Sequence, residues 1–162
     1  MTAFEGCPGS RMMDFTKENS PEEATGKVGS QLRQWPIQMH LISPLAPYYQ
    51  GADVLLTADC VAYALGGFHP EYLKGKAIAI ACPKLDEGQD VYVEKIKSWL
   101  EDAKINTLTV LIMQVPCCGG LLNLAMQAVQ ASSRKVPVKA IVVGVEGDIL
   151  SEEWVPAEAA NV

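Results

Sequence analysis

The chain has 162 residues, of which 49% are hydrophobic and 20% charged, a size and composition that suit one folded domain and exclude a disordered chain. Its formal charge of −6 argues against nucleic acid or an anionic membrane as the main partner, because both bind clustered lysine and arginine. No apolar run approaches the roughly 20 residues that a bilayer demands, and residues 1–14 do not resemble a secretion signal. We therefore expect a cytoplasmic protein.

Residues 1–30 are rich in glycine, proline, serine and charge, and they predict an irregular N-terminal arm. Residues 30–35 favour a short helical turn that Pro36 ends. Five short segments rich in Ile, Val and Leu then predict strands, at 37–42, 52–58, 76–81, 107–115 and 138–145. Three of them (76–81, 107–115 and 138–145) are nearly continuous apolar runs, which is typical of a parallel sheet buried on both faces.

Helices are predicted between these strands, at 61–65, 87–104 and 121–132, where apolar residues recur at helical spacing. Alternating strands and helices indicate an α/β fold: three layers, with a mostly parallel five-stranded sheet, helices on both faces, and a flavodoxin-like or Rossmann-like topology. We expect the domain to span residues 31–150, followed by a loosely packed acidic tail at 151–162.

The cysteines carry the functional signal: Cys7, Cys60, Cys82, Cys117 and Cys118. Their odd number and the adjacent pair argue against a disulfide framework. Cysteine follows three successive predicted strands, and the carboxyl ends of parallel strands meet at one end of a sheet, where α/β proteins build their sites. We therefore predict a metal centre there, although buried cysteines with no shared role remain an alternative.

Gly119 and Gly120 follow the cysteine pair and open a predicted helix. Glycines at a helix start let backbone N–H groups approach an anionic ligand such as a thiolate-bound cluster. The same geometry would lower a thiol pKa, so a reactive thiolate is a competing interpretation. Asp59, Lys84 and Asp86 lie beside the cysteines and could position the loops or bind a partner, but we interpret them as solvated loop charges.

Cys7 lies in the sequence Gly6-Cys7-Pro8-Gly9 of the arm. It is either a further ligand that folds over the sheet or a mobile thiol. Structural zinc sites usually contain two cysteine pairs spaced by two to four residues, and this chain has no such pairs. The one-per-strand spacing favours an iron–sulfur cluster, with zinc as the alternative.

Several long sequence segments, which occur in the same order, resemble a family of anaerobe proteins described as ferredoxin-like, iron–sulfur-binding oxidoreductases. These segments are GCPGSRMMDF (6–15), SQLRQWPIQ (30–38), GADVLLTADCVAYALG (51–66), KGKAIAIACPKLD (74–86) and QVPCCGGLL (114–122). The resemblance spans residues 6–150. In that family this region follows a ferredoxin module that holds 4Fe–4S clusters, whereas this chain has no Cys-x-x-Cys-x-x-Cys run. The resemblance implies redox work in an anaerobe and carries over to the five cysteines alone.

Our hypothesis is an electron-transfer protein that binds a 4Fe–4S cluster. Cys60, Cys82 and one or both of Cys117 and Cys118 are the expected ligands, with Cys7 as the fourth. A ferredoxin or a larger redox enzyme is the expected partner, and a homodimer is left open. The alternatives are a cysteine- or cluster-dependent oxidoreductase acting on a small molecule, and a zinc-binding interaction domain.

Overall fold

The computed structural model describes residues 12–15 and 26–156. Its centre is a five-stranded sheet of β3 (Asp53–Ala58), β4 (Ala77–Ala81), β5 (Thr107–Met113), β6 (Val138–Val143) and β7 (Ile149–Val155). The strand order is β4-β3-β5-β6-β7, with β3 to β6 parallel and β7 antiparallel to β6. The side chains of β3, β4 and β5 are almost all buried, as their continuous apolar sequences predict.

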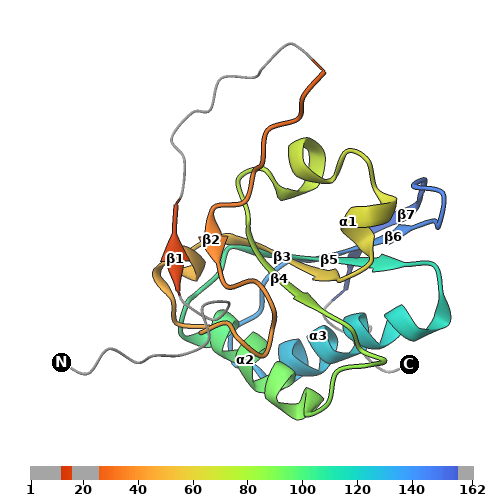
Figure 1. Cartoon of the computed structure of the whole chain (residues 1–162). Coiled ribbons are helices and arrows are strands. Elements are labelled where there is room, and N and C mark those ends of the chain that lie inside the picture. The colour runs from red at the N-terminus through yellow and green to blue at the C-terminus, as the bar shows by residue number, and fades with distance from the viewer. Residues whose placement is uncertain (1–11, 16–25, 157–162) are drawn as a thin grey trace.

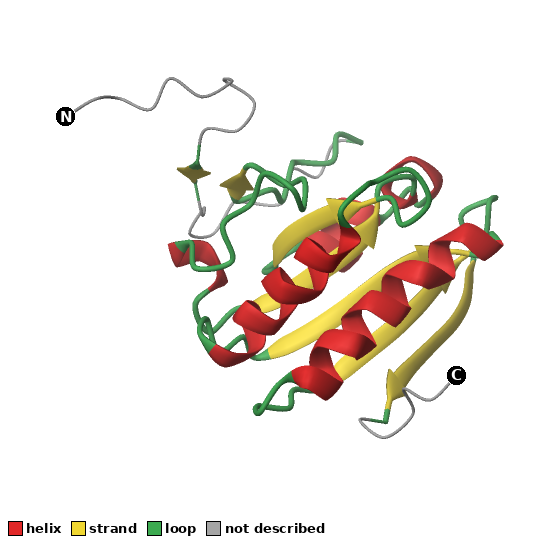
Figure 2. Cartoon of the chain, turned by 90° about the horizontal axis from the view of Figure 1, so that it is seen from below, coloured by secondary structure: helices red, strands yellow, loops and turns green. Residues whose placement is uncertain are grey.

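Helices cover both faces of this sheet, which confirms the predicted α/β class. The two long helices, α2 (Gln89–Glu101) and α3 (Gly119–Ala131), pack side by side on one face (Figure 2). The short α1 (Val61–Ala64) and a π-helical turn at Phe68–Leu73 lie on the other face (Figure 1). Two 3-10 turns, Pro47–Tyr49 and Pro116–Cys118, complete the described helical segments.

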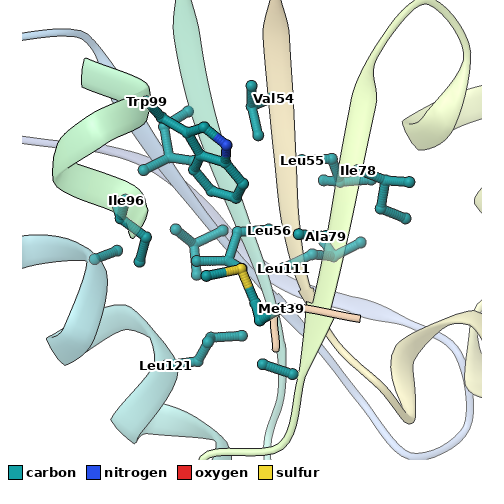
Figure 3. Close-up of a cluster of buried hydrophobic side chains, with 14 of the residues drawn as sticks. Met39, Val54, Leu55, Leu56, Ile78, Ala79, Ile96, Trp99, Leu111 and Leu121 are labelled. Atoms are coloured by element: carbon teal, nitrogen blue, oxygen red, sulfur yellow. The ribbon is translucent and has the colours of Figure 1, made fainter. Parts of the chain in front are cut away.

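The core lies between the sheet and the two long helices. Ile96 and Trp99 of α2 and Leu121 of α3 are buried against the strands, with Leu56 close by (Figure 3). The ring of Trp99 lies 5.0 Å from that of Tyr49. Each fully buried side chain of this size contributes about 1.5–3 kcal/mol to folding, so the core holds the strand ends in fixed positions.

The prediction of a strand over residues 37–42 is wrong. Only Gln38 forms an isolated parallel bridge, to Ile80 of β4, because Pro36 and Pro44 confine this segment to a short turn. Nearby, the fully buried side-chain amide of Gln34 accepts the N–H of Ile78 and donates to its carbonyl at 2.8 and 3.0 Å. Together these bonds cover the outer edge of β4, which protects it from pairing with another chain.

The predicted helical turn at 30–35 is also wrong. Gln34 and Trp35 form the short strand β2 (Gln34–Trp35), which pairs antiparallel with β1 (Met13–Asp14). This ribbon joins part of the predicted irregular arm to the domain. Residues 1–11, 16–25 and 157–162, and with them the prediction for Cys7, lie outside the described residues.

A larger correction concerns the C-terminal segment. Residues 151–155 were expected in a loose tail, but they belong to β7, so the sheet extends beyond residue 150. The acidic sequence of β7 does not resemble a strand. An edge strand nevertheless tolerates charged side chains at exposed positions. Lys139 of β6 forms an ion pair with Glu152 and lies over the ring of Trp154.

None of the described helices combines the length and the apolar character that crossing a bilayer requires.

Candidate metal centre

The topology of the sheet places its switch point at the carboxyl ends of β3 and β5. In the sheet, β3 lies between β4 and β5. The chain therefore runs from β3 to β4 on one side of β3, and from β4 to β5 on the other side. Open α/β sheets bind ligands at such a switch point. Cys60 lies two residues beyond β3, and Cys117 and Cys118 lie in the 3-10 turn that follows β5. Cys82 follows β4 directly.

Cys60 is exposed at the end of β3, where its thiol donates a hydrogen bond to Oδ1 of Asp59 at 3.4 Å. That bond, slight burial and the charges of Asp59, Cys118 and Cys82 raise the pKa of Cys60 above its ordinary value. The thiols of strands β3, β4 and β5 therefore lie close enough to repel one another when ionised.

Cys118 is the buried member of the group. Burial raises its pKa, a hydrogen bond with the Met113 backbone opposes this, and the neighbouring Cys117 and Cys82 raise it further. Cys60, Cys82 and Cys118 thus lie at the same end of the sheet, close enough for their charges to interact. The expectation that this geometry lowers a thiol pKa is wrong for Cys60, whose pKa is raised mainly by the hydrogen bond to Asp59, and for Cys118, whose pKa is raised mainly by burial.

Among the described residues, no three cysteine, histidine or carboxylate side chains stand close enough together to hold one metal ion. The four thiols lie at one end of the sheet without forming a compact tetrahedron. A single zinc ion holds sulfur ligands at about 2.3 Å and would need these side chains to move together.

The loop that carries Cys82 is held by a carboxylate. Asp86 Oδ2 accepts the Cys82 N–H at 2.9 Å, the Tyr92 hydroxyl at 2.5 Å and the Gln38 amide at 3.4 Å. Partial burial pulls the pKa of Asp86 upward, but these three bonds outweigh it and the pKa falls below its ordinary value. The interpretation of Asp86 as a solvated loop charge is therefore wrong.

The same loop presents the sulfur of Cys82 to a backbone donor. The Leu85 N–H donates to Sγ of Cys82 at 3.3 Å. Hydrogen bonds to thiolate sulfur are one means by which proteins tune the potential of an iron–sulfur cluster. Cys82 thus has its backbone fixed by Asp86 and its sulfur already oriented.

Gly119 and Gly120 have different surroundings at the start of α3. A Cβ atom on Gly120 would lie 3.2 Å from Cβ of Pro83, so glycine there allows the Cys82 loop to pack against the helix that follows Cys118. A Cβ atom on Gly119 would meet no atom within 4 Å. Gly120 brings two cysteine loops together, while Gly119 leaves open space beside the cysteine pair.

A polar cavity of about 380 Å³ lies elsewhere, lined by residues that include Arg33, Tyr48 and Asp53. These residues lie at the amino end of the sheet, since Asp53 begins β3. No cysteine lines this cavity, so it does not provide the pocket beside the cysteines that the small-molecule enzyme alternative requires.

A family model described as a Rossmann-like domain matches residues 46–160. The chain belongs to this family. An uncharacterized protein of Archaeoglobus fulgidus is 27% identical over 121 residues, which cover 74% of this chain and 83% of that protein. No solved structure matches. Family membership agrees with the strand order and with a site at the carboxyl end of the sheet, and it leaves the ligand open.

The sequence predicted which cysteines converge but missed what holds them. Gln38, Asp86 and Tyr92 meet only through contacts between separate elements. The one available signal was the Cys-Pro-Lys-Leu-Asp spacing at 82–86, since an acidic residue four positions on can close a turn by accepting a backbone N–H.

Proposed function

We propose that this chain binds a 4Fe–4S cluster at the carboxyl end of its sheet and passes electrons to a redox partner in the cytoplasm of an anaerobe. The convergence of Cys60, Cys82 and Cys118 at the switch point of the fold is the observation that carries the proposal. The resemblance to ferredoxin-like oxidoreductases, which carries over to the five cysteines alone, agrees with it.

The donor chemistry fits a cluster. All the converging side chains are thiols, which iron–sulfur clusters prefer. A cluster contains several metal atoms, so its ligands lie farther apart than those of one ion, which suits thiols that lie at one end of the sheet without closing on a single point. Cys60, Cys82 and Cys118 would be ligands, with Cys117 or Cys7 as the fourth.

The chain's own groups would hold and tune the centre. Asp86 fixes the backbone of Cys82, and the Leu85 N–H points at its sulfur. The backbone at the start of α3, beside Gly119, favours negative charge. A bound cluster supplies one-electron redox chemistry, and its positive metal charge would offset the repulsion between neighbouring thiolates, which contributes to the raised pKa of Cys60 and Cys118.

The reactive-thiol alternative has less support. A nucleophilic cysteine needs a lowered pKa, whereas the pKa values of Cys60 and Cys118 are raised. A small-molecule reaction at a cluster, and a zinc-binding interaction domain, remain the alternatives that the first experiment separates.

The test is iron and acid-labile sulfide content with a visible spectrum, on protein prepared and reconstituted without oxygen. We expect about four irons and four sulfides per chain, with a broad absorbance typical of thiolate-bound clusters. Zinc binding without iron uptake would favour the interaction domain. No iron after reconstitution would overturn the proposal.

A separate variant tests whether Cys82 is a ligand of the cluster. Cys82→Ser should lose most of the iron while its circular dichroism stays native. Ala62→Ser is the matched control, because it adds the same hydroxyl at an exposed position two residues from Cys60. If Cys82→Ser and Ala62→Ser retain equal iron, Cys82 is not a ligand.

A further inference from the structure

Apolar side chains surround the cysteines at the carboxyl end of the sheet. Each of the segments that follow β3, β4, β5 and β6 exposes one of them to solvent: Tyr63, in α1, is 94% exposed, Leu85 79%, Val115 38% and Val145 61%. Scattered apolar residues are normal on protein surfaces. Here they occupy four neighbouring segments around one site, which is typical of a surface that contacts another protein.

Contacts between these segments join three of the four side chains, Tyr63, Val115 and Val145, into one surface. The Val145 N–H donates to the side chain of Gln114 at 2.8 Å, which ties the loop after β6 to the residue before Val115. Gly147 approaches the Ala64 carbonyl so closely that a Cβ atom would lie 2.6 Å from it, which ties the same loop to α1. We call Tyr63, Leu85, Val115 and Val145 the apolar collar.

Charge around the apolar collar has one dominant sign. Within residues 59–63, 82–90, 114–118 and 144–148 there are six carboxylates and one lysine, a formal charge of −5: Asp59, Asp86, Glu87, Asp90, Glu146 and Asp148, against Lys84. The whole chain has a charge of −6, so most of its net charge lies here. Asp86 is half-buried by its three hydrogen bonds, and Glu87, Asp90, Glu146 and Asp148 are exposed.

We infer that the apolar collar is the docking surface for an electron-transfer protein whose contact face is apolar at its centre and ringed by lysine and arginine. This inference rests on the proposed function for the partner's redox role. Opposite charges steer the two proteins together, and the apolar contact excludes water above the cysteines.

Charge also decides between partners. A second copy docked through the same face would bring −5 against −5, and nucleic acid or an anionic membrane would be repelled as well. Of the two expected partners, a ferredoxin with an acidic contact face fits poorly. A larger redox enzyme with a basic docking face fits well.

The test measures binding separately from electron transfer. The probe is cytochrome c with zinc in place of iron, a basic redox protein whose exposed porphyrin edge is ringed by lysine. Its affinity for the chain is measured by titration calorimetry at low and at physiological salt, with and without the reconstituted cluster. We expect binding that weakens steeply with salt.

Two variants locate the contact. Tyr63→Ser and Leu85→Ser should each weaken binding by about fivefold or more, as loss of a central apolar contact does. Leu45→Ser and Trp154→Ser are matched controls, since both side chains are exposed and lie outside the apolar collar. Equal losses in all four variants, binding that does not depend on salt, or no binding would overturn the inference.

The outcomes also separate this inference from the proposed function. Salt-dependent binding that needs Tyr63 and Leu85 in a chain that takes up no iron would keep the docking surface and remove the cluster. Full iron content, together with unchanged binding in Tyr63→Ser and Leu85→Ser, would keep the cluster and remove the docking surface.

Discussion

The two ends of the parallel strands differ in what their loops do. At the amino end, loops are closed by hydrogen bonds: Arg134 donates to the carbonyls of Ile105 and Leu100 at 2.8 and 3.2 Å, and Asp53 accepts Asn106 and Thr107 at 2.8 and 2.7 Å. At the carboxyl end, the loops present thiols and exposed apolar side chains.

Charge follows the same division. Residues 49–53, 74–76, 102–107 and 132–138 hold five basic and two acidic side chains, a formal charge of +3, against −5 at the carboxyl end: Lys74, Lys76, Lys104, Arg134 and Lys135, with Asp53 and Asp102. The comparison teaches that hydrogen bonds and basic charge gather at the amino end, while thiols, exposed apolar side chains and acidic charge gather at the carboxyl end, where we propose binding. Variants at the two ends should therefore separate stability from cofactor content.

The largest expected effect is loss of the cluster from Cys118→Ser. Cys118 interacts electrostatically with the thiols of both Cys60 and Cys82, so we expect it to be the ligand of the adjacent pair. Iron content should fall to near background in Cys118→Ser and stay above half in Cys117→Ser. The reverse pattern, measured by iron assay, would move the ligand role to Cys117.

Gly120→Val should disturb the packing of the loops at the carboxyl end of the sheet. The new side chain would collide with Pro83, and overpacking of this kind costs about 1–3 kcal/mol. Urea unfolding of the apo-protein should show that loss, and reconstitution should yield less iron because the Cys82 loop is displaced. Gly119→Ala, whose Cβ meets open space, is the control and should leave apo-protein stability unchanged. Equal stability of the two variants would mean that the Pro83 contact does not hold the loops together.

Arg134→Ala should lower the stability of the fold without affecting the cysteines at the other end of the sheet. Removing a charged donor from two backbone carbonyls costs about 2 kcal/mol, so the urea midpoint should fall while the iron content of the folded protein stays unchanged. Lys84→Ala, at the exposed carboxyl end, should have no comparable effect on stability. Iron loss in Arg134→Ala at a temperature where it remains folded would show that the two ends are coupled.

The smallest expected effect is a pH dependence of the apo-protein. Because the pKa values of Cys60 and Cys118 are raised in the folded state, their contribution to stability is present below the ordinary thiol pKa and is lost as pH rises through the higher folded values. Unfolding midpoints should therefore decline gradually above the ordinary thiol pKa. Cys118→Ser should reduce this decline, and an unchanged profile in that variant would contradict the assignment.

Asp86 should shape the acid side of the same profile of stability against pH. Its pKa is lowered in the folded state, so its contribution is present above the ordinary carboxyl pKa and is lost as pH falls through the folded value. Asp86→Asn should flatten the acid limb and leave the alkaline limb unchanged. A parallel shift of both limbs would indicate a general loss of stability instead.

The sequence by itself determined the α/β class, the four parallel strands and the end of the sheet at which the cysteines gather. These follow from local patterns, because continuous apolar runs form buried strands and cysteine follows three of them. It did not determine the segment at 37–42 or the strand β7. Their state depends on which partner strand is available, and local preference is a weak guide at the edge of a sheet.

Only the tertiary structure decided how the site is held. Gln34, Gln38 and Asp86 are polar residues whose sequence context resembles a solvated loop, yet their partners lie on separate elements. Burial of Cys118, and the charge interactions of Cys82 with Cys60 and Cys118, likewise depend on how distant segments pack. Hydrogen bonds and charge interactions between distant segments exist only once the chain has folded, so the sequence could place the cysteines at one end of the sheet but not reveal what orients them.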